Sequence, residues 1–157
     1  MIVVSNTSPI NYLILTGYIE VLPALFGEIH IPQAVFNELS DVAAPPLVRD
    51  WIVQAPSWLQ VQSVSQVADT TLALLDPGEQ AAILLAQELR ADLILLDDMQ
   101  ARRAATQKSL NITGILGILD QAATRKLIDL PTAVKSLRNT SFWVADSLLQ
   151  RLLDKHS

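Results

Sequence analysis

The chain has 157 residues, of which half are hydrophobic, and a net charge of −5. This length suits a single domain, residues 1–157, with a substantial core, and the hydrophobic content excludes intrinsic disorder. With no cysteine and only two distant histidines, thiol catalysis, thiolate zinc sites and histidine-rich metal sites are excluded, so any metal would need oxygen ligands. The acidic balance argues against a broadly basic nucleic-acid-binding surface but is compatible with a local basic patch.

The sequence carries no sign of a membrane or secretory segment. No apolar run reaches the roughly 18–20 residues that cross a bilayer. Residues 1–15 lack the basic region and the small-residue cleavage site of a signal peptide. We therefore expect a soluble, cytoplasmic protein that does not contact a membrane.

A short strand and a helix are predicted at the start of the chain. Residues 2–5 (IVVS) form an apolar run typical of a strand buried on both faces, and this strand should end at Asn6. Ser8 and Pro9 predict the N-cap and first residue of the following helix. Glycines then end this helix and a second short one, at Gly17 and Gly27.

The next predicted elements are a second strand and a helix that carries an acid. Residues 28–31 predict the strand, and Pro32 opens a helix with Glu38 near its end, off the apolar side. The proline-rich region 41–69 is less regular, and we expect a helix, a loop and a short strand at 59–62 there.

The second half has clearer signals and completes an α/β pattern. A helix follows the DPGE sequence at residues 76–79, and residues 91–96 give the strongest buried-strand signal in the chain. This alternation favours a mainly parallel sheet with helices on both faces. The remaining predicted elements are a polar helix at 99–109, a strand at 111–113 and helices at 115–125, 131–139 and 144–155.

Polar residues follow two of the predicted strands. Strand 2–5 ends at Asn6, and strand 91–96 ends at Asp97 and Asp98. Ligands of open parallel sheets bind beyond the carboxyl ends of the strands, so these side chains could line one crevice. Adjacent carboxylates repel each other unless a cation, hydrogen bonds or solvent compensates, which makes the pair a candidate metal site.

Each acid also has an ordinary structural interpretation. Asp98 could be the N-cap of the helix that follows it. Asp76 and Glu79 fit a capping box, which alone would account for both residues. Glu38 taken alone would be a surface residue of its helix. The residue types therefore leave the metal site and the structural roles open.

The order of the motifs resembles one family. VVSNTSP, IPQAVFNEL, DPGEQAAILLA, ADLILLDDMQARRAA and TGILGIL follow one another with spacings similar to those of the PIN-domain family. The resemblance is to metal-dependent ribonucleases typified by VapC toxins, within a branch with an NTSP opening, and it runs from residue 2 to the C-terminal FWVADSLLQRLL. It implies a three-layer α/β/α Rossmann-like fold, an acidic site for Mg²⁺ or Mn²⁺, RNA hydrolysis, a homodimer and a small antitoxin partner.

The resemblance also implies roles for particular residues. The metal-site positions are matched by Asn6, Glu38, Glu79 and Asp98, with Asp97 as a neighbour that could substitute. Glu38, Glu79 and Asp98 would be the catalytic residues. Such a site fits the chemistry, because hard cations held by carboxylates can activate water and stabilise charge at a phosphate.

Several polar residues near these acids could bind the substrate. Arg102 and Arg103 could contact phosphate, although the polar face of a surface helix would also account for them. The hydroxyls of Thr7, Ser8 and Thr113 could contact water or phosphate, but each also suits a cap or turn.

Asn6 departs from the usual family pattern, which has aspartate there. An amide oxygen can bind a divalent cation, but the lost charge weakens the attraction and argues against two bridged metals. We expect reduced activity more than complete loss. The alternative is a degenerate PIN domain that binds RNA or protein without cutting. A phosphoacceptor receiver domain is disfavoured, since receivers place their acidic pair after the first strand.

The C-terminal region could supply a partner surface. Trp143 beside Phe142, together with Leu148, Leu149, Leu152 and Leu153, could contact a second copy or an antitoxin. Such a stripe more often packs on its own core, which is the interpretation we favour.

Overall fold

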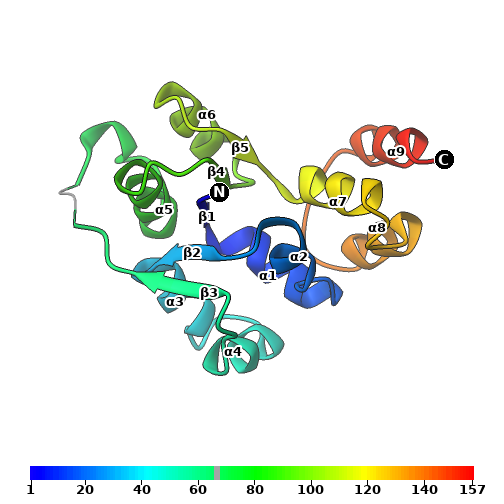
Figure 1. Ribbon diagram of the computed structural model, residues 1–157, viewed down its shortest axis with the longest axis horizontal. Helices are drawn as coiled ribbons and strands as arrows, with labels where there is room; N and C mark the ends of the chain where they lie inside the picture. The colour runs from blue at the N-terminus through cyan, green and yellow to red at the C-terminus, as the bar shows by residue number, and fades with distance from the viewer. Residues whose placement is uncertain (66–67) are drawn as a thin grey trace.

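Five short parallel strands form a central sheet in the order β3-β2-β1-β4-β5 (Figure 1). The computed structural model describes residues 1–65 and 68–157. Because β1 lies between β2 and β4, the strand order reverses direction at β1, as in Rossmann-like folds. The strands are β1 (Val3–Ser5), β2 (Ile29–Pro32), β3 (Leu59–Gln62), β4 (Leu93–Leu95) and β5 (Ile112–Thr113).

Helices cover both faces of this sheet. Along β1, Val3 packs into the core cluster that includes α1 and α7, while Val4 packs into the cluster formed with α5 and α6. On β4, Leu95 packs into the first of these clusters and Ile94 into the second, which confirms the three-layer α/β/α fold. The helices are α1 (Thr7–Thr16), α2 (Val21–Phe26), α3 (Gln33–Ser40), α4 (Pro46–Val53), the 3-10 helix η1 (Thr70–Leu72), α5 (Pro77–Glu88), α6 (Met99–Gln107), α7 (Ile115–Thr124), α8 (Leu130–Arg138) and α9 (Asp146–Lys155).

Helix α1 begins earlier than the sequence predicts. The N-cap is Asn6, with extended backbone angles of φ −80° and ψ 177°, so the prediction of Ser8 as the cap is wrong by two residues. Pro9 is tolerated inside the first turn because the first N–H groups of a helix have no intrahelical acceptor. The predicted end is confirmed, since Gly17 adopts the left-handed conformation at φ 82°.

The region between β2 and α5 contains the expected helix and strand, α4 and β3. Trp51 on α4 and Trp58 before β3 pack against each other with ring centroids 5.8 Å apart. Both rings lie against the larger core cluster and so attach this region to the body of the fold.

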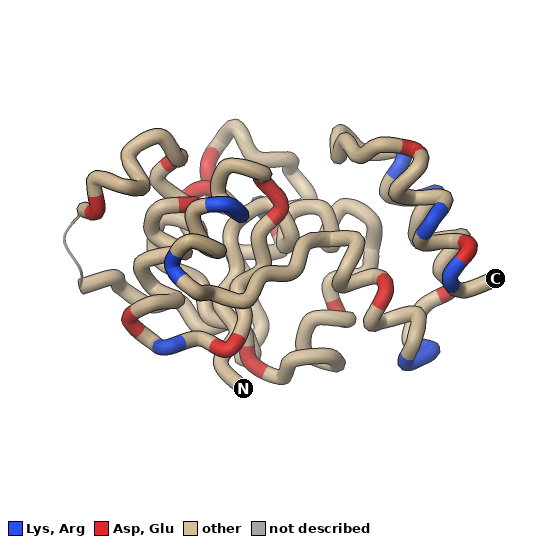
Figure 2. The backbone as a smooth tube through the Cα atoms, turned by 90° about the horizontal axis from the view of Figure 1, so that it is seen from above, with Lys and Arg blue, Asp and Glu red and all other residues tan. Residues whose placement is uncertain are grey.

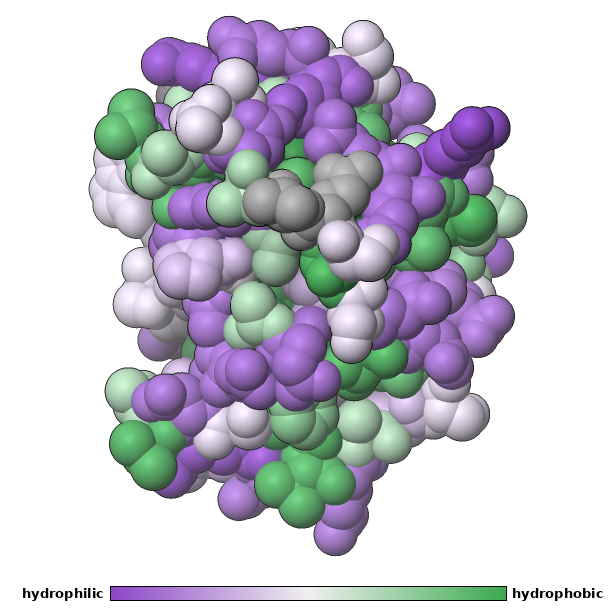
Figure 3. All heavy atoms as spheres, turned by 90° about the vertical axis from the view of Figure 1, so that its left-hand side faces the viewer, coloured by the Kyte–Doolittle hydropathy of each residue, from purple (hydrophilic) through white to green (hydrophobic). Residues whose placement is uncertain are grey.

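The surface is polar and unevenly charged. The face in Figure 3 is mostly hydrophilic, with small separate hydrophobic clusters. The helix that ends at the C terminus carries both acidic and basic residues, and acids are also spread through the body (Figure 2). Among residues 1–65 and 68–157, no helix combines the length and the apolar character that a membrane span needs.

Replacing Leu95 with alanine should destabilise the sheet core. Leu95 is fully buried on β4, which lies between β1 and β5. We expect the free energy of unfolding in urea to fall by about 2–5 kcal/mol, because a cavity adds to the lost apolar burial. Leu74→Ala is the control, since Leu74 is 90% exposed and its replacement should change stability by less than about 0.5 kcal/mol.

Candidate functional site

A cleft of about 1040 Å³ lies at the carboxyl end of the sheet, where the strand order reverses. Asn6 leaves β1 and Asp97 leaves β4, and these strands are direct neighbours, with Ser5 paired to Leu95. The predicted meeting of the two strand ends is therefore found. The predicted residues that line the cleft are Asn6, Thr7, Ser8, Glu38, Glu79, Asp97, Asp98, Arg102 and Thr113. Arg103 is exposed on α6 and is absent from this lining, so the geometry gives no support to its expected phosphate contact.

Helices α1, α5, α6 and α7 all begin at this cleft. The partial positive charge of a helix N-terminus favours nearby carboxylates. Asp97 accepts a hydrogen bond from the Ile115 amide of α7 at 2.9 Å, although the two residues lie far apart in sequence. Asp98 accepts one from the Ala101 amide of α6 at 3.0 Å. Backbone amides thus hold both members of the acidic pair.

The capping box predicted at α5 is present. Asp76 accepts a hydrogen bond from the Glu79 amide at 2.7 Å, and Glu79 Oε1 accepts one from the Asp76 amide at 3.1 Å. The same two carboxylates line the cleft. Asp76, Glu79 and Asp98 therefore cap helices, as their structural interpretation predicts, and they also line the candidate site.

Glu38 reaches the cleft across the first turn of α5. A Cβ atom built on Gly78 would lie only 1.6 Å from Glu38 Oε1, so no other residue type fits there unless Glu38 moves. The glycine therefore lets a carboxylate from α3 lie directly against the α5 backbone. Glu38 leaves its helix off the apolar stripe formed by Val35 and Leu39, as the sequence predicts.

Several buried oxygen atoms in the cleft have no hydrogen-bond partner. Buried polar groups are normally paired, so each exception needs an explanation. In the described part of the chain, five buried side-chain atoms are unpaired, and four of them belong to cleft residues. These four are Asn6 Oδ1, Thr7 Oγ1, Glu38 Oε1 and Asp97 Oδ2. The cleft thus concentrates oxygen atoms that can accept a hard cation or a hydrogen-bond donor.

Burial, and then neighbouring negative charges, raise the pKa values of Glu38 and Glu79. Burial raises the pKa of Glu79 to about 7, the Asp76 amide opposes this rise, and the charges of Asp76, Asp98 and Glu38 add to it. Burial is also the largest cause of the raised pKa of Glu38, followed by the charge of Asp76. The Thr7 hydroxyl lowers the pKa of Glu38, although its geometry falls short of a hydrogen bond.

Asp97 has a cation beside it. Burial raises the Asp97 pKa, while the Ile115 amide and the Arg102 guanidinium lower it. Arg102 itself donates to the Leu96 carbonyl at 3.4 Å, which turns its side chain back toward the end of β4. Gly114 leaves room for both groups, because a Cβ there would lie 2.5 Å from Asp97 Oδ1 and 2.7 Å from Arg102 Nη1.

The donor set fits a hydrated divalent cation. In the described part of the chain, no three His, Cys, Asp or Glu side chains converge closely enough to form a metal-binding group. The acids therefore surround the cleft without forming a closed cage. Mg²⁺ usually keeps several waters and needs only one or two carboxylates, so unpaired oxygens on Asn6, Glu38 and Asp97 suit such an ion.

Sequence reasoning missed other residues of the cleft. Asp76 was accounted for by its capping role, and the close approach at Gly78 depends on a contact between distant helices. Met99 and Trp143 also line the cleft, and both are largely exposed. The only sequence signals were the DPGE segment and an aromatic pair next to a predicted helix.

Glu79 should make stability depend on pH. Its folded-state pKa of about 7 lies above its ordinary value of 4.5, so the folded chain gains stability by keeping the proton, and this gain is lost as the pH rises through 7. We expect the free energy of unfolding to fall by roughly 1–2 kcal/mol between pH 5 and pH 8, allowing for screening by solvent.

Urea unfolding of Glu79→Gln at both pH values tests this expectation. Glutamine keeps the acceptor of the capping box and has no titrating proton, so the fall should flatten. Glu28→Gln, at an exposed position before β2, should keep the slope of the unchanged protein. An equal slope in both variants would contradict the assignment to Glu79.

Of the comparisons with known proteins, one identifies a family, and it agrees with this architecture. Among curated proteins and among solved structures, none matches the chain. A family model described as a PIN domain matches residues 2–157, nearly the whole sequence. With the parallel sheet and the acidic cleft at its carboxyl end, the chain belongs to the PIN-domain family.

Proposed function

We propose that this chain is a metal-dependent endoribonuclease of the toxin type, which hydrolyses RNA phosphodiester bonds with Mg²⁺ or Mn²⁺. The observation that carries the proposal is the set of four unpaired buried oxygens in the cleft, on Asn6, Thr7, Glu38 and Asp97. Family membership adds support, because PIN domains are generally nucleases.

Asn6, Glu38 and Asp97 would hold the cation through their unpaired oxygens. Asp97 is the better ligand of the acidic pair in this geometry, because its Oδ2 is buried and unpaired while Asp98 is exposed and caps α6. Asp98 and Glu79 would add negative charge around the ion. A bound divalent cation would lower the pKa of a water and neutralise charge developing on the phosphate.

Glu79 would act as the general base. Its pKa of about 7 is suited to a general base near neutral pH. The Asp76 amide holds Oε1, and within the described residues Oε2 accepts no hydrogen bond, so Oε2 is the atom that would receive the proton of the attacking water.

Arg102 would bind the phosphate group. Its guanidinium lies beside Asp97, and its one hydrogen bond to the described residues is a long one to the Leu96 carbonyl, so it can exchange that contact for a phosphate oxygen. Ser8 and Thr113 bring hydroxyls to the same cleft and would orient the phosphate or its water. These residues would position the substrate against a cleft that otherwise repels anions.

Asn6 favours a second candidate function. Its amide oxygen supplies a ligand without charge, so a degenerate PIN domain that binds RNA or protein without cutting is the alternative. Two carboxylates and one amide oxygen are still enough ligands for a hydrated Mg²⁺, which supports the nuclease.

Cleavage of a labelled RNA by the purified chain, with Mn²⁺, Mg²⁺ or EDTA, tests the proposal. We expect metal-dependent cutting that falls by at least a hundredfold in Asp97→Asn and in Asp98→Ala, as is roughly typical when a group that stabilises charge is removed. Asp50→Asn on α4, an exposed aspartate absent from the cleft lining, should cut like the unchanged protein. Asn6→Asp should tighten metal binding in calorimetry and speed cutting, because it restores a negative charge.

The outcomes separate the two candidates. RNA cleavage that persists in EDTA, or in both Asp97→Asn and Asp98→Ala, would contradict the proposed site. If only Asn6→Asp cuts, the natural chain is a disarmed PIN domain. No cutting by either protein would favour the binding module.

Gly78→Ala should weaken cation binding without unfolding the protein. Its new methyl group would displace Glu38, while alanine is the better helix former by about 1 kcal/mol. We expect Mn²⁺ affinity by calorimetry to fall about as far as in Glu38→Ala, with the melting temperature maintained. In a double-mutant cycle, Gly78→Ala should add nothing once Glu38 is alanine. Full additivity would show that the glycine acts elsewhere.

The toxin role, a neutralising antitoxin and a homodimer are supported by the sequence resemblance alone and stay predictions. A small antitoxin would act by placing a helix or an arginine in the acidic cleft.

A further inference from the structure

Trp143 differs from every other aromatic side chain of the molecule. It is 84% exposed, although apolar side chains of this size usually bury most of their surface. The other aromatic residues are at least partly buried against the larger core cluster; they are Tyr12, Tyr18, Phe26, Phe36, Trp51, Trp58 and Phe142. The expected core packing is confirmed for Leu149, Leu152 and Leu153, whereas Trp143 and Leu148 remain exposed.

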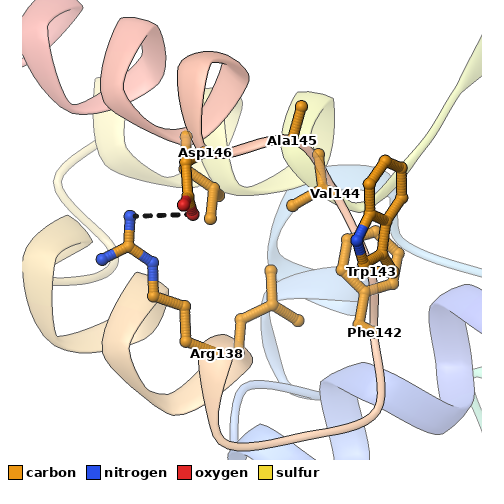
Figure 4. Close-up of a pocket in the computed structure, with 8 residues that line it drawn as sticks. Arg138, Phe142, Trp143, Val144, Ala145 and Asp146 are labelled. Carbon is orange, nitrogen blue, oxygen red and sulfur yellow. Dashed lines mark ion pairs between the residues drawn. The ribbon is translucent and has the colours of Figure 1, made fainter.

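Trp143 stands on a strap between two hollows. The strap, residues 142–145, is the last part of the connection between α8 and α9, and all four residues line both the acidic cleft and a second pocket of about 320 Å³. Phe142 fixes the strap by packing edge-on against Tyr12 of α1, with ring centroids 5.1 Å apart. Figure 4 shows the Trp143 indole on the strap beside Phe142 and away from the ion pair in the pocket.

The second pocket is lined by a positively charged side chain, Arg138, that can bind a phosphate. Arg138 at the end of α8 faces Asp146 at the start of α9, with Nη2 and Oδ1 3.9 Å apart (Figure 4). The two side chains are 48% and 94% exposed, so the pair is weak and readily exchanged. A phosphate could therefore replace Asp146 as the partner of Arg138.

We propose that Trp143 and Arg138 form a subsite for single-stranded RNA, in which one unpaired base stacks on the indole and a neighbouring phosphate pairs with the guanidinium. The proposal rests on the proposed function, because the strand would pass from the acidic cleft over the strap. Trp143 is thus a positioning residue for the substrate and takes no part in the chemistry.

The chemistry of the surface favours a nucleic acid over a protein. The pocket beyond the strap is lined by Arg138 and Asp146 as well as by apolar residues, so it offers a cation that a wholly apolar groove for a protein helix would lack. Exposed aromatic rings accept any base through its π-face, and adjacent cations follow the backbone. A paired base in a duplex cannot offer that face, so the subsite selects unpaired strands.

The test combines binding and kinetics on Trp143→Ala, Trp143→Phe and Arg138→Gln. A labelled single-stranded RNA and a duplex of the same sequence are the probes, with fluorescence anisotropy in Ca²⁺ for affinity and cleavage in Mn²⁺ for KM and kcat. Leu74→Ala, at another exposed apolar site, is the matched control.

We expect Trp143→Ala to raise Kd and KM for the single strand about tenfold to a hundredfold, with kcat largely kept. Trp143→Phe should recover most of the loss, and affinity for the duplex should not change. Arg138→Gln should reduce the salt dependence of binding by about one phosphate contact, which Trp143→Ala should not do. RNA should also quench tryptophan fluorescence in the natural chain and not in Trp143→Phe.

Failure of this inference is distinct from failure of the proposed function. Cutting by the natural chain with KM unchanged in Trp143→Ala would overturn the subsite and leave the nuclease. Binding that depends on Trp143 without any cutting would support the subsite and remove the nuclease. If Trp143→Ala leaves RNA affinity unchanged but alters sedimentation, the strap is a contact between copies of the chain and the subsite is overturned. A natural chain that neither binds nor cuts RNA overturns both.

Discussion

The hydrogen bond from the Ile115 amide to Asp97 is the interaction on which the site depends. It joins the exit of β4 to the start of α7 and leaves the other oxygen of the same carboxylate unpaired in the cleft. The capping of α5 by Asp76 and Glu79, and of α6 by Asp98, repeats the arrangement. Helix N-termini stabilise carboxylates, so the fold can gather acids that would otherwise drive one another apart.

The helix N-termini stabilise these carboxylates only in part, so some of the acids remain easier to protonate than usual. Glu38, Glu79 and Asp97 all have raised pKa values, with burial as the first cause in each case. A group held in this way is stabilised by a proton or by a cation. Asn6 carries no charge, so fewer charges repel one another here than with an aspartate, and a cation would be attracted less strongly.

Much of the architecture followed from local patterns. The apolar runs at β1 and β4 are buried on both faces, so their parallel pairing brought Asn6 and Asp97 together as expected. The start of α1 was misplaced because Pro9 suits several positions of a first turn. Trp143 and Leu148 were expected in the core because apolar residues at these positions predict burial, whereas the sequence cannot show which of them the core covers. The approach of Glu38 to Gly78 joins residues distant in sequence, so no local pattern contained it.

The contact between Glu38 and Gly78 also offers a way of sorting related chains. A larger residue at the glycine position would leave α5 intact and capped, so the sheet, the cores and the overall outline would persist. The same replacement would displace the Glu38 carboxylate from its position in the cleft. Chains that look alike in fold could therefore be divided by this one position into those in which the α3 carboxylate lies against α5 and those in which it is displaced.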